Sequence, residues 1–168
     1  MTLLGGALVV GLWPIGAGAH DHRPPRAHIL TDTDRARMER GSYSWSEKQG
    51  RFCSSVISDA FLVSYPRAVD YTIGDRVRLR FRKHHKPDAV KIRQYREVKK
   101  NGQPKGDGRR KSFTLGKVIV NGNVRWEARF EIKRPGHHYF DVTASWKDVD
   151  NCGGQAADWV THLKAVKS

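Results

Sequence analysis

The chain has 168 residues, of which 38% are hydrophobic and 29% are charged. This composition is typical of a globular domain and excludes a disordered tail, and the length suits one domain with a hydrophobic core. Lys and Arg number 31 against 17 Asp and Glu, which gives a formal net charge of +14. Such an excess favours polyanionic partners through long-range attraction.

Residues 1–19 contain no charged side chain and end in Ala17-Gly18-Ala19. An apolar run followed by small residues is typical of a secretory signal peptide, so we expect export and cleavage after Ala19. The run has no preceding Lys or Arg and approaches the length that spans a bilayer. An uncleaved anchor and a buried N-terminal strand therefore stay as alternatives. We place the protein outside the cell or on the extracellular face of the envelope.

Residues 20–41 include Pro24-Pro25 and show almost no apolar periodicity. We expect a flexible tether there, followed by the folded domain at residues 42–168. Cleavage after Ala19 would make His20 the first residue and His22 the third. A free amine with histidine at the third position can bind Cu(II) or Ni(II) in a square-planar geometry. We predict no other metal ion and no cofactor.

From Tyr43 onward the hydrophobic pattern has a period of two. In residues 124–132, VRWEARFEI, the apolar side chains share one face and the charged ones share the other, which predicts a half-buried strand. Turn residues such as Asn121-Gly122 separate neighbouring strands, and no long helix-period stretch interrupts them. Seven or eight such strands predict an all-β fold, an antiparallel β-sandwich. We expect them at 42–48, 55–64, 76–82, 89–98, 112–120, 124–132, 138–146 and 156–165.

The chain has two cysteines, Cys53 and Cys152, without the CxxC spacing of a metal site. In an oxidising compartment they predict one disulfide. Two buried free thiols become the better interpretation only if the chain is not exported. An up-and-down order of the strands puts both cysteines at the same end of the sandwich, as a disulfide requires.

Three runs resemble the later part of an immunoglobulin-like β-sandwich: GDRVRLRF, VRWEARFEI, and PGHHYFDVTASW with its Pro-Gly turn and a tyrosine entering a penultimate strand. The resemblance covers residues 54–166 at the level of architecture. The chain departs from antibody domains, because its two cysteines lie outside the centres of the strands. The resemblance implies a fold, and a fold by itself implies little about function.

The positive charge is concentrated between Arg76 and Lys111, where fifteen Lys or Arg and three acids give +12. Arginine alternates with apolar residues at 76–82, so a row of guanidinium groups is expected on the outer face of one strand, with Lys91 and Arg93 of the next strand beside it. Guanidinium groups bind phosphate and sulfate in a bidentate manner. The predicted polyanion-binding residues are Arg76, Arg78, Arg80, Arg82, Lys91, Arg93, Lys99, Lys100, Arg109, Arg110 and Lys111.

A charged row is also compatible with a solvated strand face, and charges on an edge strand oppose aggregation. The corresponding hypothesis is a secreted structural or protein-interaction domain, such as an inhibitor or adhesion module, whose charge serves solubility only. Base-specific recognition of nucleic acid is not predicted, since neither zinc-finger spacing nor an RNP-like run occurs.

Other candidate groups are weaker. The pairs His84-His85 and His137-His138 are expected at opposite ends of the sandwich, which argues against a shared metal site. Trp45 and Tyr139 stay open as sugar-binding aromatic residues. No catalytic motif occurs, so we expect no enzyme; a pocket lined by two or more titratable groups would be the feature that argues for one.

The sequence therefore predicts a secreted or cell-envelope β-sandwich that is monomeric and non-enzymatic. Its basic face is expected to bind an anionic polymer or surface, namely a cell-wall polymer, a glycan, a phospholipid surface or nucleic acid. A protein partner is the alternative.

Overall fold

The computed structural model describes residues 24–59, 64–83, 85–147 and 151–167. The predicted signal peptide, the His20 and His22 site, and His84 lie outside the described residues. Within the described part of the chain, no helix has the length and apolar character needed to cross a membrane.

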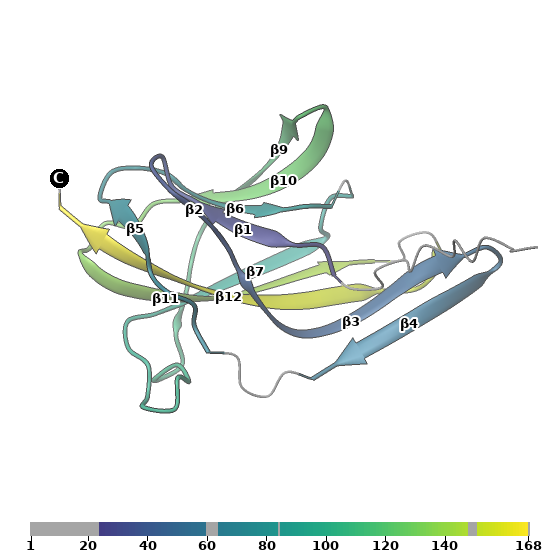
Figure 1. Ribbon diagram of the computed structural model, residues 1–168, viewed down its shortest axis with the longest axis horizontal. Coiled ribbons are helices and arrows are strands. Elements are labelled where there is room, and N and C mark those ends of the chain that lie inside the picture. Colours follow the sequence, from purple (N-terminus) through teal and green to yellow (C-terminus); the bar gives the residue numbers. More distant parts are fainter. Residues whose placement is uncertain (1–23, 60–63, 84, 148–150, 168) are drawn as a thin grey trace, which may run out of the picture.

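Twelve β-strands in the described residues form two sheets that pack face to face (Figure 1). The five-stranded sheet has the order β2-β1-β6-β10-β9. The seven-stranded sheet has the order β4-β3-β12-β11-β7-β8, with β5 also paired to β12. The strands are β1 (Ala27–Leu30), β2 (Arg35–Arg37), β3 (Glu39–Gln49), β4 (Phe52–Ser58), β5 (Val69–Thr72), β6 (Val77–Phe81), β7 (Ala89–Tyr95), β8 (Arg109–Arg110), β9 (Thr114–Val120), β10 (Asn123–Phe130), β11 (Gly136–Trp146) and β12 (Gln155–Val166).

The predicted all-β antiparallel sandwich is confirmed, with one parallel pair, β5 beside β12. The strands outnumber the predicted seven or eight. The additional ones are β1, β2, β5 and β8, which are only two to four residues long. A period of two is recognised reliably only over runs longer than these, so elements this short leave little pattern in the sequence.

Alternation of inward and outward side chains builds the core between the sheets. The apolar residues of β6, β11 and β12 that alternate in the sequence are buried, and the rings of Trp45 and Trp146 pack edge to face with centroids 5.4 Å apart. Trp45 is 1% exposed. It belongs to the core, so its interpretation as a sugar-binding residue is wrong.

The segment predicted as a tether contains strands. Residues 27–41 form β1, β2 and the start of β3, and Ile29 and Met38 are buried in the core. The tether prediction is therefore wrong for these residues. The apolar residues here are few and are separated by charged ones, so the sequence shows no regular period, yet each apolar residue has a place between the sheets.

The two strands predicted to share one basic face lie in different sheets. Both edges of β6 are occupied, by β1 and by β10, whereas β7 lies between β11 and β8. β6 and β7 therefore do not pair as a hairpin. The prediction that Lys91 and Arg93 stand beside the arginine row is wrong, because β1 takes the position that was assigned to β7.

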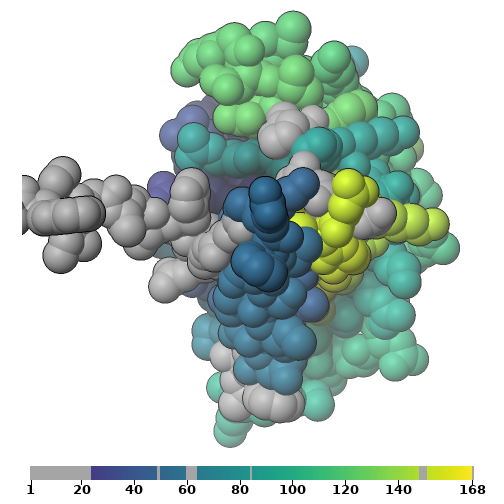
Figure 2. Space-filling model, turned by 90° about the vertical axis from the view of Figure 1, so that its right-hand side faces the viewer, coloured from purple at the N-terminus to yellow at the C-terminus, as the bar shows by residue number. Residues whose placement is uncertain are grey.

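The predicted disulfide between Cys53 and Cys152 is present, with the Cα atoms 5.4 Å apart. Cys53 lies near the start of β4 and Cys152 lies shortly before β12. The bond therefore attaches the β3–β4 hairpin to the connection between β11 and β12. Figure 2 shows the hairpin (blue) beside β12 (yellow), in agreement with the pairing of β3 and β12. A disulfide is consistent with an oxidising extracellular location.

Candidate functional site

The arginine row of β6 is matched by acidic groups of the protein itself. Arg78 and Arg80 point away from the core, as predicted, while Leu79 between them is fully buried. The Nη2 atom of Arg78 lies 3.3 Å from Asp32, and Nη2 of Arg80 lies 2.6 Å from Glu127. Two cations of the row are thus neutralised internally, so the repulsion between like charges needs no external anion there.

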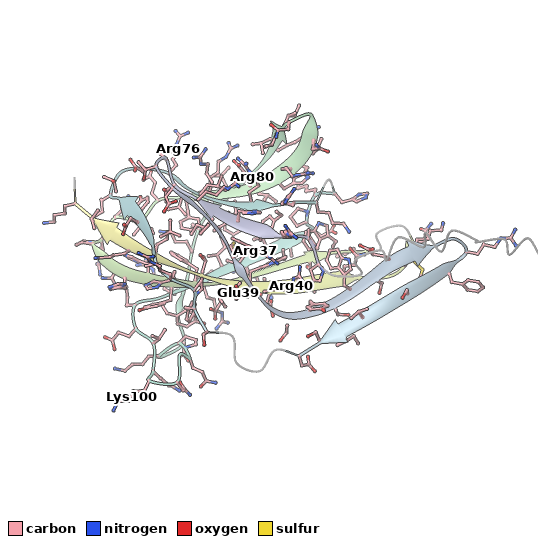
Figure 3. The ribbon with its side chains drawn as sticks, viewed as in Figure 1. Arg37, Glu39, Arg40, Arg76, Arg80 and Lys100 are labelled. Carbon is pink, nitrogen blue, oxygen red and sulfur yellow. A yellow bond between two sulfur atoms is a disulfide. The ribbon has the colours of Figure 1, made fainter. Side chains whose placement is uncertain are left out.

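The remaining predicted residues fall into three places. Arg76 and Arg82 lie directly before and directly after β6. Figure 3 shows Arg76 on the side of the five-stranded sheet, whereas Lys100 lies at the tip of the loop after β7, on the opposite side of the molecule. Lys99 belongs to the same loop. The third group gathers along the β7–β8 edge of the seven-stranded sheet and consists of Lys91, Arg93, Arg109, Arg110 and Lys111.

A cleft of about 500 Å³ lies next to this edge, where the chain passes twice between the sheets. Residues 111–113 lead from β8 to β9, and residues 131–135 lead from β10 to β11. Six lining residues are cationic and none is acidic. These cations are Arg96, Arg109, Arg110, Lys111, Lys133 and Arg134.

His138 and Arg96 organise the base of this cationic cleft. His138 is only 1% exposed, and its Nε2 donates to the carbonyl oxygen of Arg134 over 2.8 Å. Its Nδ1 then accepts from the side-chain amide of Gln94, and Arg96 Nη1 lies 2.7 Å from Nε2 and 3.2 Å from Nδ1 of the ring. The Nη2 atom of Arg96 also donates to the carbonyl oxygen of Pro135 over 2.8 Å. Arg96 is therefore held in place before any ligand arrives.

Burial, together with the nearby charges of Arg96 and Lys111, lowers the pKa of His138 to about 4. The ring is neutral at physiological pH, which matches the donor on Nε2 and the acceptor on Nδ1. The charge of the cleft thus comes from its lysines and arginines.

Lys111 lies between the cleft and the core. Its ammonium donates to the carbonyl oxygen of Glu131 and lies 5.4 Å from the centre of the Phe130 ring. Burial lowers the pKa of Lys111, and the neighbouring charges of Arg109 and Lys133 contribute in the same direction. An anion in the cleft would relieve this repulsion among cations.

The cleft contains three of the predicted polyanion-binding residues, Arg109, Arg110 and Lys111, together with Arg96 of the predicted basic segment. Its other two cations, Lys133 and Arg134, were not predicted. Lys133 and Arg134 directly precede Pro135-Gly136 and lie outside the basic segment 76–111. Their charges were visible in the sequence, but nothing there placed them beside β8.

A second pocket, of about 610 Å³, lies on the outer face of the seven-stranded sheet. Its lining includes four titratable side chains, Asp141, Asp158, Tyr65 and Tyr95. A pocket lined by two or more such groups is the feature that would argue for an enzyme. The hydroxyl of Tyr65 donates to Asp141, and burial raises the pKa of both groups. In this arrangement the Asp141 carboxylate accepts the hydrogen bond from Tyr65.

The histidine pairs do not form a metal centre in the described residues. Nδ1 of His137 lies 2.8 Å from Nε2 of His162, and the rings of Tyr139 and His162 stack with centroids 4.1 Å apart. No group of three or more His, Cys, Asp or Glu side chains in the described ranges is arranged to hold a metal ion.

A scan against protein-family models finds no match for the chain, and searches of curated proteins and of solved structures find none either.

Proposed function

We propose that the protein is a secreted or envelope-associated binding module, with an immunoglobulin-like architecture, whose cationic cleft binds an anionic polymer. The observation that carries the proposal is the lining of the cleft, which has six cations and no acid. Elsewhere on the sandwich, cations such as Arg78 and Arg80 are paired with carboxylates. Positive charge in a concave site without neighbouring carboxylates favours the binding of an anion.

The shape and rigidity of the cleft support the same function. Arg96 is anchored by Pro135 and His138, so little conformational freedom is lost when its remaining N–H groups bind a phosphate, sulfate or carboxylate. The guanidinium groups of Arg109 and Arg110 project from a two-residue strand at the sheet edge. A linear polymer can therefore lie along the edge while one of its anionic groups enters the cleft.

The experiment compares two double variants that remove the same charge from different places. Arg109→Ser with Lys133→Ser removes one Arg and one Lys from the cleft. Arg76→Ser with Lys117→Ser removes the same pair from the five-stranded sheet, where both side chains are exposed. Binding of a fluorescent heparin fragment is measured by titration at several salt concentrations.

We expect the cleft variant to lose at least about tenfold in affinity. The slope of log affinity against log salt concentration should become shallower by roughly one for each contact removed. The matched variant of the other sheet should lose about threefold or less, because only the long-range attraction changes. Equal losses in both variants, or a wild-type protein that binds no polyanion at low salt, would refute the proposal.

A second candidate function, interaction with a protein, is favoured by strand β4. Within the described residues, no strand pairs with its outer edge, and the seven residues FCSSVIS carry no charge. Phe52 and Ile57 are 80% and 72% exposed. An uncharged edge of this kind can accept an extended segment of a partner as a further strand. Isotope-edited NMR would detect it as protection of the β4 amides on addition of the partner.

A further inference from the structure

Three hollows on the seven-stranded sheet share residues and form one continuous track. The cationic cleft and a groove of about 380 Å³ are both lined by Arg110. That groove and the pocket on the outer face are both lined by Lys91 and Arg93. From Lys91 to Arg96 the track covers about 16 Å along the chain, at about 3.3 Å for each residue, which exceeds the length of one sugar or nucleotide.

The charge changes along this track. The cleft end has cations only, whereas the pocket end combines Lys91 and Arg93 with Asp141 and Asp158 and has no net charge from these four residues. The two ends therefore suit different groups. An anionic group fits the cleft, and a group with several uncharged donors and acceptors fits the pocket.

The pocket offers acceptors and donors from four neighbouring strands. Asp158 of β12 and Lys91 of β7 both face Thr143 of β11, which is the register partner of each. A bulge in β3 places Gly41 against Asp158, where the ideal Cβ of an alanine would lie 3.3 Å from the Asp158 Cβ. A glycine at this position leaves room beside the carboxylate.

A sugar is the ligand that such a pocket recognises. Each hydroxyl group of a sugar both donates and accepts, so carboxylates, ammonium groups and a threonine hydroxyl within one pocket can all be used. A phosphate backbone would instead meet two carboxylates. Stacking of a base is also disfavoured, since Tyr95 is buried beneath Gly108 and the ring of Tyr65 already packs against Tyr139, with centroids 5.0 Å apart.

We infer that the polymer bound by this protein is a linear anionic polysaccharide in which charged and uncharged sugars alternate, with an anionic sugar in the cleft and an uncharged sugar in the pocket formed by Lys91, Arg93, Thr143 and Asp158. This inference rests on the proposed function of the cleft. It adds the class of polymer and a second binding site.

The test asks whether removal of one negative charge weakens or strengthens the binding of two different polymers. Asp158→Asn removes a negative charge from the pocket, and Asp70→Asn makes the same change on the exposed side of β5. The probes are an oligosaccharide of alternating uronic acid and N-acetylhexosamine units, and an oligothymidylate that carries the same number of negative charges. Affinities are measured by isothermal titration calorimetry with the full chain.

For the oligosaccharide we expect Asp158→Asn to weaken binding by about tenfold, because the charged acceptor of a sugar hydroxyl is replaced by a neutral amide, which accepts more weakly. For the oligothymidylate the same variant should bind slightly more tightly, because a repulsive charge is gone. Asp70→Asn should change both affinities by less than about twofold. Thr143→Val, which alters no charge, should also weaken binding of the oligosaccharide. Thr114→Val in β9, at the edge of the five-stranded sheet, should not.

The inference is overturned if Asp158→Asn strengthens binding of both probes, since the polymer would then be held by charge alone, as a nucleic acid would be. The proposed function fails in a different way, namely when Arg109→Ser with Lys133→Ser leaves the affinity for both probes unchanged. Circular dichroism of each variant confirms that the sandwich is folded.

Discussion

Arg80 of β6 and Glu127 of β10 are register partners on the outer face of the five-stranded sheet, and Arg80 Nε donates to Glu127 Oε1 over 2.7 Å. Glu127 is 2% exposed, and its second oxygen accepts from Arg129 Nε at 3.2 Å. A single buried carboxylate therefore compensates two arginines. This arrangement explains how the sheet tolerates a row of like charges without a ligand.

Glu127→Gln should lower the free energy of unfolding by about 3 kcal/mol, because it leaves the partly buried Arg80 without its counter-charge. Urea unfolding followed by tryptophan fluorescence measures the change. The control is Glu131→Gln, an exposed residue whose substitution should stay within about 0.5 kcal/mol. If the two variants have the same stability, the Glu127 pair contributes no more than a surface charge.

Removal of the disulfide by Cys53→Ser with Cys152→Ser should lower the free energy of unfolding by about 4 to 5 kcal/mol. The bond joins residues 99 positions apart, and closing so long a loop restricts the unfolded chain strongly. The measurement is urea unfolding at neutral pH. Wild-type protein treated with a thiol reductant should match the variant, and a loss below about 1 kcal/mol would contradict the prediction.

Stability should fall as the pH decreases from about 6.5 towards 4. Burial holds the pKa of His138 at about 4 in the folded protein, against about 6.5 in the unfolded chain. Between these values the unfolded state binds more protons, so acid favours unfolding, by up to about 3 kcal/mol. Burial also lowers the pKa of His28 and His162, which adds to the trend.

The variant His138→Gln isolates the contribution of His138. Its free energy of unfolding should vary less with pH than that of the wild type. The measurement covers the range from about pH 7.5 to about pH 4. His162→Gln serves as the comparison, because its ring is only half-buried. A curve for His138→Gln that runs parallel to the wild-type curve would show that His138 binds protons equally in both states.

Gly108→Ala should destabilise the protein more than Gly106→Ala. Both glycines have a positive φ, of 67° and 80°, so both substitutions carry the backbone penalty of an L residue in that region. Only at Gly108 would the new Cβ clash with the ring of Tyr95; at Gly106 it meets open space. We expect a difference of about 1 to 3 kcal/mol by thermal unfolding. Equal losses would mean that the Tyr95 ring moves aside freely.

The strands that were predicted well are those with a sustained alternation. The run 124–132 gave β10 in nearly its full length, and 138–146 gave most of β11, because each inward residue packs against the opposite sheet. The disulfide also followed from the sequence, since an exported chain with two cysteines has one pairing available. Short elements such as β1 and β8 were missed, because they depend on neighbours that are distant in sequence.

The candidate site could be predicted only in part. The sequence alone determined that the basic segment has an excess of positive charge, and that the arginines of β6 point away from Leu79. The tertiary structure decided which cations act together. β1 occupies the edge of β6 where β7 was predicted, and β7 belongs to the other sheet. Lys91 and Arg93 therefore lie on the opposite face of the sandwich from the arginine row. The connection at 131–135, which passes between the sheets, brings Lys133 and Arg134 to Arg109, because contacts between sheets depend on topology and not on distance along the chain.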